Sequence, residues 1–126
     1  MGNNWKITDT LTKVFAEEAP DGQGSIRLST LHRETVSCVI AYFGAADWGR
    51  YWKVSVKAPE KIETRLRRVE LVPSAYPCHK EQDDNYLRIV PGMYPDLLRD
   101  LDTEDDGADK KYLTKEVAGQ GRSLWL

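Results

Sequence analysis

The sequence of 126 residues predicts an all-β fold, because three observations favour strands over helices. Residues 50–58 alternate between apolar and polar side chains, which is the period of a strand with one buried face. Several other short apolar runs are separated by clusters of turn-forming residues, and helical patterning is weak. We therefore expect an antiparallel, immunoglobulin-like β-sandwich with a long proline-rich loop and at most a short helix.

Three short strands are expected in the first third of the chain. They are predicted at residues 5–8, 11–15 and 25–28, with the turn-rich loop 20–24 before the last of them. Residues 35–43 are apolar at nearly every position. This pattern is typical of a central strand that is covered on both faces, or of a strand at a domain contact.

The alternating segment 50–58 follows this central strand after a short turn-rich connection, residues 44–49. Such a connection predicts that the two segments form a hairpin. Trp52 falls on the apolar phase together with Val54 and Val56, so we expect its side chain in the core rather than in a binding site.

The second half of the chain is expected to contain fewer regular elements. Residues 62–73 predict a strand with a bulge near residues 65–67, because the apolar phase changes there. The pattern of residues 95–101 fits one or two helical turns with a proline at the start. Residues 122–126 have strand composition, and a domain seldom ends on Leu-Trp-Leu, so we expect a chain that is cut before a further domain.

Composition and charge disfavour several classes of protein. The 18 basic and 20 acidic residues leave a net charge of −2, which argues against a nucleic-acid-binding face. No apolar run approaches the roughly 20 residues that span a bilayer, and the N-terminus lacks the layout of a signal peptide. Only Cys38 and Cys78 are present, so a disulfide scaffold is not expected, although a bridge between these two stays open. These features favour a cytoplasmic protein without nucleic-acid or membrane partners.

The segment 73–98 has a different character, with four prolines and three tyrosines. A long proline-stiffened loop tends to be functional or to pack against a neighbour. Its run 91–98 (PGMYPDLL), with Arg33-Glu34, 69–73 (VELVP) and 84–88 (DNYLR), resembles the N-terminal β-sandwich domain of proteins grouped with glycoside hydrolase family 123. The final Leu-Trp-Leu looks like the start of the strand that leads toward the catalytic barrel in that family.

The resemblance covers most of the chain and implies a non-catalytic accessory domain that braces a barrel. Enzymes of the family remove β-linked N-acetylgalactosamine, using the acetamido group of the substrate and an Asp-Glu pair in a (β/α)₈ barrel. Such a barrel needs roughly 250 residues, so the catalytic pair has no counterpart here. The expected partner is this covalently following barrel, and no catalytic residue, cofactor or metal is expected in the chain itself. The residues expected to form the contact are Asp84, Asn85, Tyr86, Arg88, Met93, Tyr94, Asp96 and Leu97.

A free-standing carbohydrate-binding module is the alternative. Trp48 lies at the tip of the expected hairpin and is the candidate for stacking on a sugar, because flat aromatic rings offer a large apolar surface. The two functions differ in a measurable way, since a module binds the sugar by itself, whereas a bracing domain exposes apolar side chains in the loop.

A small standalone enzyme is disfavoured, because no convergent catalytic set stands out. Asp83 and Asp84 are adjacent in sequence, whereas paired glycosidase carboxylates face each other across a sugar about 5–5.5 Å apart. The acidic stretch 102–107 resembles a calcium loop, but its twelfth position is Leu113, which supplies no oxygen ligand. The basic cluster of residues 65–68 is expected to be solvated or ion-paired.

Overall fold

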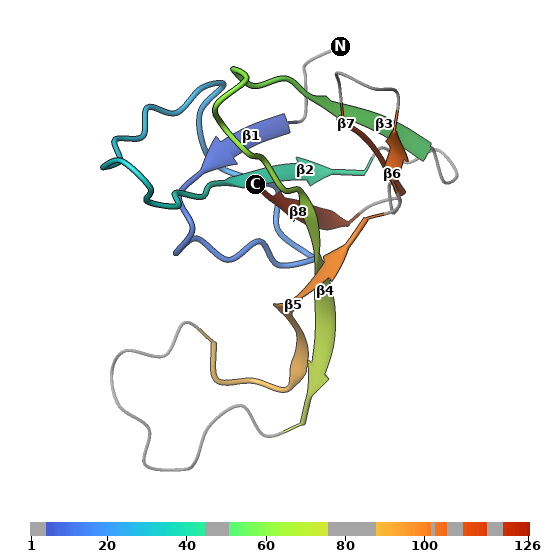
Figure 1. Ribbon diagram of the computed structural model, residues 1–126. Coiled ribbons are helices and arrows are strands. Elements are labelled where there is room, and N and C mark those ends of the chain that lie inside the picture. Colours follow the sequence, from blue (N-terminus) through green and yellow to red (C-terminus); the bar gives the residue numbers. More distant parts are fainter. Residues whose placement is uncertain (1–4, 45–50, 76–87, 102, 106–109, 116–119) are drawn as a thin grey trace.

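The computed structural model describes residues 5–44, 51–75, 88–101, 103–105, 110–115 and 120–126. These residues form antiparallel strands and no helix, and the strands make up two sheets (Figure 1). The predicted all-β, sandwich-like architecture is therefore confirmed. No helix that could span a membrane occurs within the described ranges.

One sheet has five strands and the other has three. In spatial order they are β1-β2-β8-β4-β5 and β3-β7-β6. The bounds are β1 Trp5–Thr8, β2 Val39–Phe43, β3 Tyr51–Val56, β4 Arg67–Ser74, β5 Gly92–Asp100, β6 Thr103–Asp105, β7 Lys110–Lys115 and β8 Gly121–Trp125.

Strand β2 lies between β1 and β8 and is covered on both faces, as its apolar sequence predicts. On one face, Val39 and Ala41 form a buried cluster with Val14. On the other face, Ile40 and Tyr42 pack in the core between the two sheets. The observed strand is shorter than the predicted one, because the ladder between β1 and β2 begins only at Val39.

The core between the sheets combines residues from four separate segments. Its buried members are Tyr42, Leu66, Tyr112 and Leu124. Val54 and Val56 of β3 pack against this cluster, whereas Lys53 and Ser55 are exposed. The alternation that predicts β3 is thus confirmed over these positions, while the side chain of Trp52 lies outside the described residues.

Three of the expected local structures are wrong. Strand β3 does not form a hairpin with β2, because it pairs with β7 in the other sheet. Residues 11–15 are not a strand: they cover the face of the five-stranded sheet through Val14 and Phe15. Residues 25–28 are also not a strand, because no backbone in the described ranges pairs with them, and Ile26 and Leu28 are exposed.

The expected helix at residues 95–101 is also wrong, because this segment belongs to β5. Strand β5 is the outer strand of the sheet, where a proline is tolerated, and the buried Pro95 pairs with Leu71. The ladder shifts register between Glu70 and Leu71, so that Asp96 is the extra residue on β5. A bulge does occur in this hairpin, but it lies here rather than near residues 65–67.

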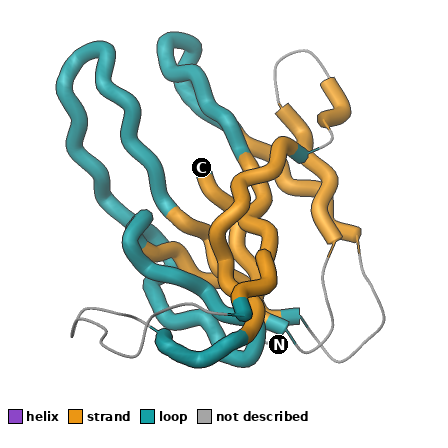
Figure 2. The backbone as a smooth tube through the Cα atoms, turned by 90° about the horizontal axis from the view of Figure 1, so that it is seen from below, coloured by secondary structure: helices purple, strands orange, loops and turns teal. Residues whose placement is uncertain are grey.

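The hairpin formed by β4 and β5 projects from the sandwich (Figure 1). Strand β4 pairs with β8 only over Arg67–Val69, but it pairs with β5 as far as Ser74 opposite Gly92. The outer half of the hairpin is therefore a two-stranded ribbon. Figure 2, seen from below, shows that long loops without regular structure reach out from one side of the strands.

Candidate functional site

Strand β5 and the residues just before it carry several exposed apolar side chains, which together we call the hairpin edge. Its large apolar side chains are 37–56% exposed, and all lie within ten consecutive positions of the chain. They are Ile89, Val90, Met93, Leu97 and Leu98. A group of exposed apolar side chains on one segment is typical of a surface that contacts another protein.

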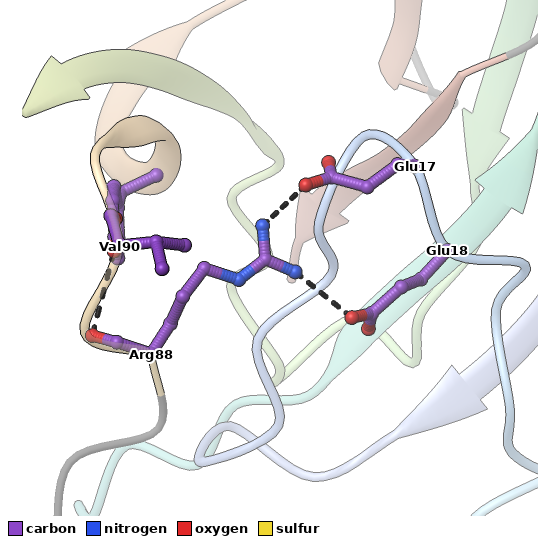
Figure 3. Close-up of polar contacts among 5 residues, drawn as sticks. Glu17, Glu18, Arg88 and Val90 are labelled. Atoms are coloured by element: carbon purple, nitrogen blue, oxygen red, sulfur yellow. Dashed lines mark hydrogen bonds and ion pairs between the residues drawn. The ribbon is translucent and has the colours of Figure 1, made fainter.

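Arg88 fastens the start of this segment to a distant part of the chain. Its guanidinium contacts the carboxylate of Glu17 through Nη1 and lies 2.9 Å from Glu18 Oε1 through Nη2 (Figure 3). The same guanidinium lies over the ring of Phe15, 3.6 Å from its centroid. This geometry is a cation–π contact combined with two ion pairs. We call these four residues the Arg88 clasp.

Two further contacts join the hairpin to the same N-terminal segment. The ring of Tyr94 meets the ring of Phe15 edge to face, with 5.8 Å between centroids, and its hydroxyl donates to the carbonyl oxygen of Val90. Lys13 Nζ donates to the carbonyl oxygen of Pro95 at 3.3 Å and lies 3.8 Å from Asp96 Oδ1.

The segment that carries the clasp is itself held on the sheet by Gly121. The backbone N–H of Gly121 donates to the carbonyl oxygen of Ala16 at 2.8 Å. A Cβ atom at Gly121 would lie 2.6 Å from the carbonyl oxygen of Phe15 and 2.7 Å from that of Glu18. Only glycine fits at this position without a backbone shift, so the start of β8 decides where the clasp lies.

The electrostatics of the clasp favour an ionic contact at neutral pH. A hydrogen bond from its own backbone, and then the Arg88 guanidinium, hold the pKa of the Glu17 carboxyl below its usual range. The side chain of Arg88 is 17% exposed, whereas Glu17 and Glu18 are about 60% exposed. The carboxylates are thus partly screened by solvent, which makes the contact sensitive to salt.

The basic cluster at residues 65–68 is ion-paired, as predicted. Arg65 Nη2 and Arg67 Nε lie 3.1 and 3.3 Å from the same carboxylate oxygen of Asp100, and Arg68 contacts Glu70. The two pairs of Asp100 hold the end of β5 to β4 and to the residues just before it, at the sandwich end of the hairpin. They therefore serve the fold rather than an anion site.

The sequence-predicted contact residues have different environments. Met93 and Leu97 are exposed, Asp96 has a largely exposed side chain, and Tyr94 is partly buried. Arg88 is held by its own chain. Four predicted residues lie outside the described residues, namely Trp48, Asp84, Asn85 and Tyr86.

Sequence reasoning missed the N-terminal half of this site. Glu17 and Arg88 are separated by 71 positions, and no local pattern relates them. The exposed pair Ile89-Val90 had a recognisable signal, because two adjacent apolar residues directly precede the turn-forming Pro91-Gly92.

No group of three or more metal-ligating side chains occurs among the residues that the structure describes. Cys38 is a buried free thiol whose pKa is raised by burial, and its backbone exchanges two hydrogen bonds with Leu126. Cys78 lies outside the described part of the chain.

The chain matches no protein-family model and no curated protein. Its function is therefore argued from the geometry of the hairpin and its fastening.

Proposed function

We propose that this chain is a non-catalytic accessory domain that braces a catalytic (β/α)₈ barrel through the hairpin edge, as in glycoside hydrolase family 123-like proteins. The observation that carries the proposal is the group of exposed apolar side chains on the outermost strand and directly before it. In the proposed parent, the barrel would cleave β-linked N-acetylgalactosamine, and this domain would contribute no reacting group.

The form of the hairpin favours side-chain packing over strand addition. Pro95 lacks a backbone donor, and the register shift near Asp96 interrupts the regular ladder of β5. Both features hinder another strand from pairing along this edge. Met93 and Leu97, in contrast, present apolar surface that a partner can bury, at roughly 25 cal/mol per Å².

The position of the hairpin also suits a bracing function. Among the described strands, β4 and β5 pair only with each other in the outer half of the hairpin, because β8 pairs only with the first three residues of β4. A projecting ribbon with apolar side chains reaches a neighbouring domain without disturbing the core between the sheets. Interfaces between domains of one chain typically bury 600–1,500 Å² in total, so the edge would form one part of a larger contact.

A binding experiment tests this proposal. The chain is mixed with the separately produced catalytic barrel of a family 123 β-N-acetylgalactosaminidase, and the Kd is measured by calorimetry. We expect the double variant Met93→Ser/Leu97→Ser to bind at least about tenfold more weakly than the wild type, because both side chains would be buried at the contact.

The matched control is Leu31→Ser, which removes a side chain that is 79% exposed and lies outside the hairpin. Equal weakening by this control, or no binding by the wild type, would argue against the proposal. Heat on titration of the chain with N-acetylgalactosamine oligomers would instead favour a carbohydrate-binding module that uses Trp48. Hydrolysis of an aryl N-acetylgalactosaminide by the chain alone would contradict the non-catalytic assignment.

A further inference from the structure

We propose that Arg88 is a positioning residue: the Arg88 clasp is a salt-sensitive fastening that holds the hairpin edge in one orientation on the sandwich. This inference rests on the proposed function only for the identity of the partner. The fastening itself is a property of the isolated chain.

The projecting hairpin needs such a fastening. Beyond Val69, β5 is the only described strand that pairs with β4, and an isolated two-stranded hairpin is marginally stable in water. The ion pairs of Asp100 hold the sandwich end of the hairpin. The outer part would move freely about this end unless another contact held it.

The Arg88 clasp and two neighbouring contacts hold the outer part of the hairpin to the N-terminal segment. Three independent interactions converge on residues 13–18: Arg88 with the two glutamates, Tyr94 with Phe15, and Lys13 with the backbone of Pro95. The hairpin residues in these contacts lie one or two positions from Val90 or Met93 in the sequence. Losing the contacts of Arg88 removes one of these three interactions and therefore loosens the segment that carries the apolar side chains.

The chemistry of the contact distinguishes arginine from lysine. Arg88 places one nitrogen on each of two carboxylates (Figure 3). Its planar group also lies over the ring of Phe15. A lysine keeps the charge but has a single nitrogen, so it cannot place a separate nitrogen on each carboxylate or stack a planar group on the ring. The fastening depends on this geometry as well as on charge.

Amide hydrogen exchange of the full chain, measured by mass spectrometry, tests the inference. We expect Arg88→Gln to raise exchange at Met93, Tyr94 and Leu97 at least tenfold, while amides of β2 and β8 stay at wild-type rates. Arg88→Lys should give an intermediate increase. The control is Arg27→Gln, which removes an exposed arginine outside the hairpin and should leave exchange there unchanged.

Salt provides a readout that a purely packing contact would not change. In the wild type, exchange of the hairpin amides should rise between about 0.05 and 0.5 M NaCl. Over this range the Debye length falls from above roughly 10 Å to below roughly 8 Å, so salt weakens the ion pairs of Arg88. In Arg88→Gln this salt dependence should become clearly smaller, and the remainder should come from the ion pairs of Asp96 and Asp100. The inference would be overturned if wild-type exchange in the hairpin did not respond to salt, and this result does not depend on the folding of any variant. It would also be overturned if Arg88→Gln raised exchange in β2 and β8 as much as in the hairpin.

The two proposals fail separately. If the wild type does not bind the barrel but Arg88→Gln loosens only the hairpin, the proposed function is wrong and the clasp stands. If the barrel binds and Arg88→Gln changes neither local exchange nor Kd, the positioning role is wrong and the bracing function stands.

Discussion

Replacing Gly121 with alanine should displace the segment that carries the Arg88 clasp. The new Cβ atom would lie 2.6 Å from the carbonyl oxygen of Phe15 and 2.7 Å from that of Glu18. Both neighbours are backbone atoms, so no side-chain rotation relieves the contact. Either β8 shifts, or the segment over it lifts away from the sheet.

The cost of the substitution follows from these two routes. If the segment stays in place, overpacking of this kind costs about 1–3 kcal/mol. If it lifts away, the burial of Val14 and Phe15 is lost, at about 1.5–3 kcal/mol for each side chain. The cheaper route determines the outcome, so we expect the free energy of unfolding to fall by about 1–3 kcal/mol.

Urea unfolding followed by tryptophan fluorescence measures this change. Gly24→Ala and Gly92→Ala are matched controls, because a Cβ at either position has no neighbour within 4 Å. These controls should change stability little or raise it by about 0.4–1 kcal/mol, through a smaller entropy of the unfolded chain. A Gly121→Ala midpoint equal to that of the controls would refute the close packing of this segment on β8.

Three other predictions concern separate parts of the fold. Arg33 has a φ of 64°, so Arg33→Gly should raise the free energy of unfolding by about 0.5–1 kcal/mol in urea unfolding, and a loss would contradict this strain. The backbone N–H of Leu31 donates to the Glu34 carboxylate and lowers the pKa of Glu34. The stability that this hydrogen bond contributes is therefore present at neutral pH and is lost as the pH falls through the lowered pKa. An NMR titration that gives an ordinary glutamate pKa would contradict this hydrogen bond. Leu124→Ala should cost about 2–5 kcal/mol because Leu124 is fully buried, whereas Leu97→Ala should cost less than about 1 kcal/mol; similar costs in thermal unfolding would contradict their different burial.

The sequence predicted well those elements whose side-chain pattern reflects burial. The alternation in β3 and the continuous apolar run of β2 follow directly from one covered face and two covered faces. The strands at both ends of the described chain, β1 and β8, were also predicted from short apolar segments. In these cases local composition and tertiary environment agree.

Local pattern failed where pairing partners decide the structure. The spacing of Leu97, Leu98 and Leu101 fits one side of a helix, but pairing with β4 draws the segment into a strand, with Pro95 at the register shift. Residues 25–28 have the pattern of a strand and find no backbone partner. The choice of β7 rather than β2 as the neighbour of β3 likewise depends on contacts between distant residues.

The candidate site divides in the same way. Met93 and Leu97 could be proposed from the sequence, because the segment is rich in proline and apolar residues. The Arg88 clasp could not be proposed from the sequence, because Phe15 and Glu17 lie about 70 positions from Arg88 and only the fold brings them together.

The most direct test of the bracing function is a hydrogen-exchange footprint of this chain with and without the family 123 barrel. Amides of Gly92–Asp100 should become protected in the complex, whereas those of residues 25–31, which carry exposed Ile26 and Leu28, should exchange as before. Protection that appears on residues 25–31 and leaves β5 unchanged would place the contact elsewhere and contradict the account.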